Sequence, residues 1–96
     1  MWRYDAAYAT VATVVMMCLK ERLEIVSEES TIDVQFRGLD RCTVTVALVM
    51  KSGAPVVSVC KEVQKEIVEE IRMLTPFVVE HVHLIVKKLV VEKTNA

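Results

Sequence analysis

Two histidines separated by a single residue, His81 and His83, are the residues that most resemble part of a metal site. On a β-strand, residues two apart point to the same face, so both imidazoles could bind one zinc ion. A catalytic zinc ion is usually bound by three protein ligands, so a third would be required. Glu80 is expected on the opposite face because strand neighbours alternate, and the cysteines are distant in the sequence. We therefore interpret the pair as surface histidines and predict no metal and no cofactor.

The residue types that serve other catalytic mechanisms are present, but not in catalytic patterns. The carboxylate pairs Glu28-Glu29 and Glu69-Glu70 lie in hydrophilic stretches typical of solvated surfaces. The sequence has no GxSxG motif for a nucleophilic serine, and neither a Walker A nor a GxGxxG motif for a nucleotide. We predict no catalytic residues and do not expect an enzyme.

The three cysteines, Cys18, Cys42 and Cys60, are odd in number, widely spaced and form no CxxC motif. A small secreted domain held by disulfides usually has four or more cysteines. Free buried thiols in a reducing cytoplasm are the better interpretation, because each thiol then packs as a small hydrophobic group.

The length and composition indicate one folded domain spanning residues 1–96, with 53% hydrophobic residues. A chain this small buries only about two-thirds of its unfolded surface, so it has more aliphatic side chains than one small core easily hides. This hydrophobicity excludes intrinsic disorder. Twelve basic and thirteen acidic side chains give a net charge of −1, which argues against a dedicated nucleic-acid-binding protein.

The first 30 residues combine an apolar helix with a polar break. Residues 6–19 carry no charge, but a helix needs about 20 apolar residues to cross a bilayer. No small-residue cleavage site follows the run, as a signal peptide would require. We therefore expect no direct membrane span and a cytoplasmic location, with any membrane association made through a partner.

The spacing of apolar residues predicts a helix over residues 4 to about 26, with the polar break at 27–30. Residues three or four apart form one apolar stripe: Tyr4, Tyr8, Val11, Val15, Leu19 and Leu23. Met16 and Met17 widen the apolar surface beyond one face, which indicates either a central helix or contact with another chain. The β-branched residues among 10–15 lower helix propensity, so a strand over part of this run remains an alternative.

The rest of the chain predicts a hairpin, a helix and a long strand. Residues 31–50 alternate between apolar and polar side chains around a short connection at 37–41, and residues 55–75 read as an amphipathic helix. Residues 78–92 are strand-like but exceed the usual strand length, so Lys87-Lys88 could be a bend or a bulge. The expected fold class is α+β, an α-β-β-α-β two-layer domain with a small, mostly antiparallel sheet.

The hydrophobic surplus concentrates in residues 6–19 and in the last strand, where Ile85 and residues 89–91 break the alternation. These segments are the expected interface, because aliphatic side chains that the core does not accommodate are left on the surface. The candidate contact residues are Val11, Val15, Met16, Met17 and Ile85. A free sheet edge is a second way in which copies of the chain could pair.

The second half of the sequence resembles the alkaline shock protein family, small envelope-stress proteins of Gram-positive bacteria. The resemblance covers about residues 31–89, or roughly 60% of the chain. It consists of an alternating valine strand at 43–49, a loop with Gly53, a helix containing Val63-Gln64, a helix end at 75–77, and a strand at 82–86. Pro76 stands where the family has glycine, Lys88 stands where a glycine often follows the last strand, and residues 23–26 lack the usual Gly-Val.

The resemblance implies a non-enzymatic cytoplasmic protein that self-associates, works near the membrane through a membrane-anchored partner, and supports envelope homeostasis under stress. It carries no catalytic residues. The alternative is a small RNA-binding or ribosome-associated domain of KH-like topology, although the sequence lacks the GXXG clamp of that fold. Arg37 and Arg41 flank the hairpin connection, and Lys87-Lys88 could lie near them in such a surface.

Overall fold

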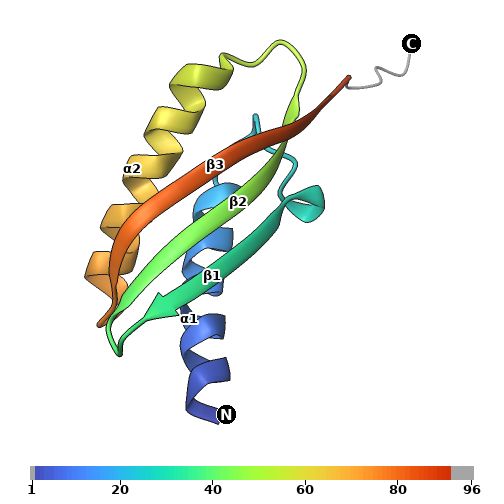
Figure 1. The fold of residues 1–96 in the computed structure, drawn as a ribbon. Helices are drawn as coiled ribbons and strands as arrows, with labels where there is room; N and C mark the ends of the chain where they lie inside the picture. The colour runs from blue at the N-terminus through green and yellow to red at the C-terminus, as the bar shows by residue number, and fades with distance from the viewer. Residues whose placement is uncertain (1, 92–96) are drawn as a thin grey trace.

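The structure, a computed structural model, describes residues 2–91, with side chains from residue 6 onward (Figure 1). The element order confirms the predicted α-β-β-α-β arrangement, with one short 3₁₀ turn, η1, after the first helix. The elements are α1 (Trp2–Lys20), η1 (Ser27–Glu29), β1 (Thr31–Arg37), β2 (Arg41–Lys51), α2 (Val56–Leu74) and β3 (Val78–Val90).

Helix α1 includes residues 10–15, so the alternative of a strand in this run is wrong. The helix ends at Lys20 rather than near residue 26, and Leu23 is 83% exposed outside it. The cause is a tertiary pairing: the Val26 N–H donates to the Val49 carbonyl, and the Lys51 N–H donates to the Glu24 carbonyl. Tyr4, which was predicted to be part of the apolar stripe, has a side chain that lies outside the described part of the structure.

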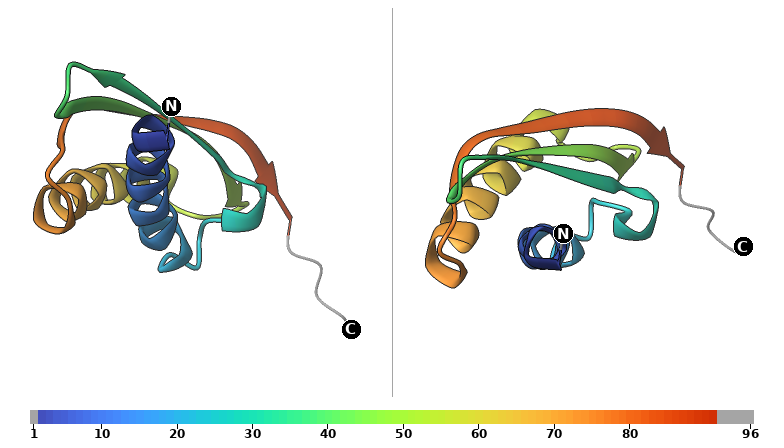
Figure 2. Two further views of the ribbon diagram at one scale, coloured as in Figure 1. Left: turned by 90° about the horizontal axis from the view of Figure 1, so that it is seen from below. Right: turned by 60° about the horizontal axis from the view of Figure 1, so that its bottom comes forward.

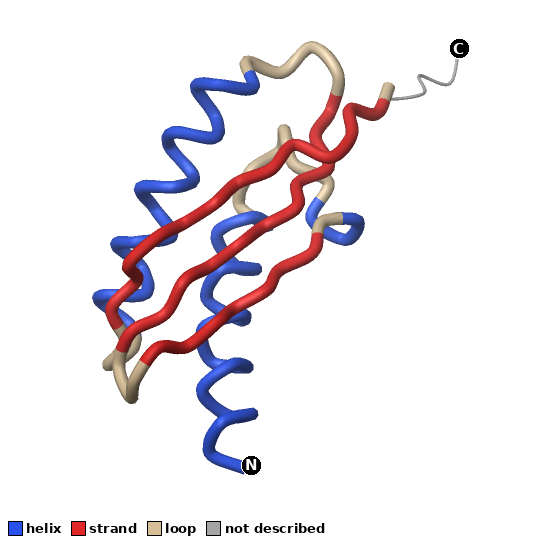
Figure 3. The backbone as a smooth tube through the Cα atoms, in the orientation of Figure 1, coloured by secondary structure: helices blue, strands red, loops and turns tan. Residues whose placement is uncertain are grey.

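The three strands form one sheet in the order β1-β2-β3 (Figure 3). Strands β1 and β2 are antiparallel, as predicted for the hairpin, whereas β2 and β3 are parallel. The sheet is therefore mixed rather than mostly antiparallel. The reason is that α2 carries the chain back along the sheet, so β3 starts beside the start of β2, and parallel neighbours need such a crossover.

Both helices lie on the same face of the sheet and leave the other face open (Figure 2). The core lies between these two layers and consists mainly of aliphatic side chains from α1, β2 and α2. Alternation places one set of side chains of β2 in this core: Cys42, Val44, Val46 and Leu48.

Strand β3 contains two irregularities in its register with β2. Leu48 is opposite Val86 and Val49 is opposite Lys88, so Lys87 is an additional residue, which confirms the predicted bulge. Glu80 is a second additional residue, between Val79 and His81. The strand ends at Val90, and the predicted end near Glu92 lies outside the described residues.

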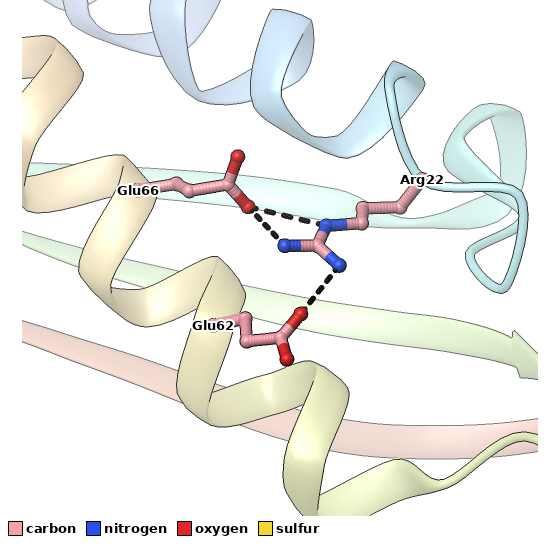
Figure 4. A network of polar contacts seen from close by, with 3 residues as sticks. All are labelled: Arg22, Glu62 and Glu66. Atoms are coloured by element: carbon pink, nitrogen blue, oxygen red, sulfur yellow. Dashed lines mark hydrogen bonds and ion pairs between the residues drawn. The ribbon is translucent and has the colours of Figure 1, made fainter.

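An ion-pair network joins the segment after α1 to α2 (Figure 4). The Arg22 guanidinium donates to Glu66 from two nitrogens, at 2.5 and 3.1 Å, and to Glu62 at 2.7 Å. These hydrogen bonds raise the pKa of Arg22 above its ordinary value. The network fixes the direction in which the chain leaves α1. Within residues 2–91, neither helix has the length and apolarity that crossing a membrane requires.

Candidate functional site

The structure separates the five predicted contact residues into two groups. Val11 and Val15 are fully buried in the core of the chain itself, so neither can touch a partner while the domain is folded, and both are removed from the predicted interface. Met16 is half-buried, whereas Met17 is 54% exposed. The surplus of apolar residues in α1 is thus used mainly inside the molecule, because this helix packs against both α2 and β1.

Met17 belongs to a small exposed apolar area where α1 meets the end of α2. Leu74 of α2 is also exposed there. A hollow of about 80 Å³ lies beside Met17 and is lined by Val14, Met17, Cys18, Glu21, Glu70 and Leu74. It is too small to hold more than a single side chain or a few water molecules.

The C-terminal half of β3 carries a second and longer exposed apolar area. Ile85 is 56% exposed, Leu89 is 51% exposed, and Val86 is also exposed, as is Val91 directly after the strand. Ile85 lies opposite Ala47 and faces the side of the sheet that neither helix covers. On the helical side, α2 and β3 diverge toward this end of the strand (Figure 1). We call residues Leu84–Leu89 the open strip of β3.

The start of α2 lies beside the open strip and adds apolar surface. Val57 is exposed there, and a hollow of about 260 Å³ separates the first turns of the helix from Leu84. Its lining is mostly apolar and consists of Val56, Val57, Cys60, Lys61, Gln64 and Leu84. A side chain arriving from outside the strand could enter this hollow.

In the N-terminal half of β3, a side chain from α2 occupies a backbone carbonyl at the edge of the sheet. The Gln64 amide donates to the Val82 carbonyl at 2.8 Å, and Val82 itself is buried. Next to this contact, α2 and β3 border a larger groove of about 640 Å³. Its lining is polar in composition and includes Lys61, Lys65, Glu69, Glu80, His81 and His83. The open strip is therefore the part of the edge that no side chain of the described residues caps.

The two histidines lie side by side, with ring centroids 5.9 Å apart and an angle of 19° between the planes. Both are exposed, and the described residues hold no cluster of three side chains suited to a metal ion. Regular alternation predicts Glu80 on the face opposite the histidines, but it lines the same groove as they do. The reason is that Glu80 is itself the additional residue of a bulge, which interrupts the alternation. Its carboxylate is engaged by Arg37 and Arg41, which hold the pKa of Glu80 below its ordinary value.

The cysteines are free thiols, as predicted, with Cys18 and Cys42 buried and Cys60 half-buried. Burial is the main reason that the pKa of Cys18 rises to about 11, and nearby carboxylates add to the effect. Burial also raises the pKa of Cys42 and Cys60. All three are therefore protonated at neutral pH, and a protonated thiol is a poor nucleophile.

The cationic residues considered for a nucleic-acid surface lie apart from one another. Arg41 is opposite Val78 at the start of β3, whereas Lys88 is opposite Val49 near its end. The expectation that Lys87-Lys88 could lie near Arg37 and Arg41 is wrong, because the parallel pairing of β2 with β3 places these pairs at opposite ends of the sheet.

Comparison with models of protein families, with curated proteins and with solved structures finds no match for this chain. The candidate site therefore rests on geometry. Ile85 was identifiable from the sequence because it breaks the alternation of its strand. Gln64 was not identifiable as an edge cap, because only the packing of α2 beside β3 brings its amide to a strand carbonyl.

Proposed function

We propose that this chain is a non-enzymatic protein that works by self-association, as a scaffold that supports cell-envelope homeostasis under stress. The observation that carries the self-association is the open strip of β3. It combines exposed aliphatic side chains with the backbone edge of a sheet, a combination that readily pairs with another strand.

The cellular part of the proposal rests on the resemblance of residues 31–89 to the alkaline shock proteins. That resemblance supports a cytoplasmic protein that reaches the membrane through a membrane-anchored partner. It brings no catalytic residues with it, which is why the proposed role is structural. The free thiols give no contrary indication, because burial raises the pKa of each.

Light scattering coupled to size exclusion tests the self-association. We expect the mass per particle to rise from that of one chain to that of two or more as the concentration increases into the high micromolar range. The midpoint of thermal unfolding should rise with concentration as well, because association with the folded state stabilises it. A monodisperse monomer at high micromolar concentration contradicts the proposal.

The membrane partner is tested by isolating the tagged chain from its native cells, with soluble and membrane fractions processed separately. We expect one integral membrane protein to co-purify reproducibly from the membrane fraction. Recovery of the chain without any membrane protein contradicts this part of the proposal and leaves the self-association to be judged by light scattering.

A further inference from the structure

The direction of the backbone groups along β3 identifies which residues can pair with another strand. The Val82 carbonyl turns away from β2, since it accepts a hydrogen bond from Gln64. Groups on alternate residues of a strand point to the same side, so the backbone groups of Leu84 and Val86 also turn outward. Beyond the bulge the direction changes. The Val90 carbonyl turns toward β2, since it accepts a hydrogen bond from the N–H of Ser52, the residue that follows β2.

The outward groups of Leu84 and Val86 lie symmetrically on either side of Ile85. We propose that a second copy of this chain adds to β3 in the antiparallel direction, with Ile85 opposite Ile85 of the second copy. The two sheets then form one continuous sheet of six strands about a two-fold axis. This inference rests on the proposed self-association and specifies its geometry.

The pairing is self-complementary at the level of hydrogen bonds. With Ile85 on the axis, Leu84 lies opposite Val86 of the second copy, and Val86 lies opposite its Leu84. Both members of each pair have their N–H and C=O groups directed toward the other strand. The same patch on two subunits thus satisfies both, as a two-fold interface requires.

The side chains support the same register. The two Ile85 side chains meet on the open face of the sheet, at the position where directly opposite residues of antiparallel strands come closest. On the other face, Val86 of the second copy reaches the mouth of the 260 Å³ hollow beside Leu84. Two exposed aliphatic side chains on each copy, Ile85 and Val86, become buried by this arrangement.

Other registers conflict with observed features. Moving the axis to His83 requires the Val82 carbonyl to pair with the second copy, but this carbonyl already accepts a hydrogen bond from Gln64. Moving it toward Lys87 brings the bulge into the ladder and places lysines of the two copies directly opposite each other, which is unfavourable. The uncharged stretch Leu84–Val86 is bounded by these two features and fits a second copy of itself.

Disulfide trapping tests the register. In Ile85→Cys, the two new thiols face each other across a non-hydrogen-bonded pair, at a separation suited to a cross-strand disulfide. The control is Leu39→Cys, because Leu39 is 95% exposed in the hairpin connection at the other end of the sheet. Under mild oxidation we expect Ile85→Cys to yield covalent dimer at least about ten times faster than Leu39→Cys and the unsubstituted chain.

A charge substitution provides the second measurement, since Ile85 is exposed and its replacement leaves the core intact. We expect Ile85→Lys to weaken dimerisation at least about tenfold, while Met17→Lys, at the other exposed apolar area, leaves it within about twofold. Circular dichroism should show both variants folded.

The outcomes separate this inference from the proposal beneath it. A monomeric unsubstituted chain overturns both. A dimer that Met17→Lys dissociates and Ile85→Lys does not, or that cross-links Leu39→Cys as fast as Ile85→Cys, overturns the β3 pairing and leaves self-association standing.

Discussion

Ser30 is a buried polar side chain with two hydrogen bonds that close a gap in the sheet. Its hydroxyl accepts from the Val49 N–H at 3.1 Å and donates to the Val26 carbonyl at 3.0 Å. Strand β1 begins only at Thr31, which pairs with Ala47, so no residue of β1 reaches Val49. The hydroxyl supplies the acceptor that a neighbouring strand would otherwise provide.

Replacing Ser30 by alanine leaves the Val49 N–H buried without an acceptor. We expect Ser30→Ala to lower the free energy of unfolding by about 1–3 kcal/mol, measured by urea denaturation. Ser52→Ala is the matched control, because Ser52 is exposed in the turn after β2. If the two variants are equally stable, water replaces the hydroxyl and the structural role assigned to Ser30 is wrong.

Helix α1 shows how the packing of an element decides the use of its residues. Its sequence is apolar around most of its circumference, which is compatible with either a central helix or an intermolecular one. In the structure it packs against α2 and β1, and the Tyr8 hydroxyl donates to the Ile32 carbonyl at 3.1 Å. Most of its aliphatic residues therefore belong to the core, and Met17 alone among its large described hydrophobic residues is more than half exposed.

Two substitutions in α1 test this inward packing. Leu19 is fully buried, so Leu19→Ala should lower the free energy of unfolding by about 2–5 kcal/mol. Met17 lies two residues away and is exposed, so Met17→Ala should change it by no more than about 0.5 kcal/mol. Thermal and urea unfolding measure both. Similar losses at the two positions would mean that the outer side of α1 is also covered.

At the scale of the whole molecule, the cationic side chains are distributed rather than gathered. Arg37 of β1 pairs with Arg41 at the start of β2, whereas Lys88 of β3 lies opposite Val49, eight residues farther along β2. At about 3.3 Å per residue this separation is roughly 26 Å. Glu80 pairs with both arginines and offsets part of their charge.

This distribution predicts weak retention on heparin, because a polyanion is held by several cations acting on the same stretch of its backbone. We expect the chain to elute below about 0.2 M salt at neutral pH. Strong retention that is lost progressively as salt is added would favour the KH-like RNA-binding alternative over the scaffold. The variant Arg37→Ala should elute at nearly the same salt concentration as the unsubstituted chain.

The order of the elements followed from the local sequence. Alternation at 31–36 and 42–46, the helical spacing at 56–74 and the turn residues Gly38 and Gly53, both with positive φ, specify local structure through short-range geometry. The bulge at Lys87 was predictable because the strand-like run at 78–92 exceeds the usual strand length and two adjacent charges interrupt its apolar stretch. These features depend on residues near one another in the chain.

Only the tertiary structure decided which apolar segments are buried in the core and which remain exposed on the surface. The same aliphatic chemistry placed Val15 in the core and Ile85 on the surface, because α1 packs against α2 and β1 while Ile85 faces the side of the sheet that neither helix covers. The early end of α1, the parallel pairing of β3 and the capping of Val82 by Gln64 likewise depend on contacts between distant segments. A hydrophobicity pattern specifies that a side chain avoids water, but the neighbours that cover it are set by the packing of the whole chain.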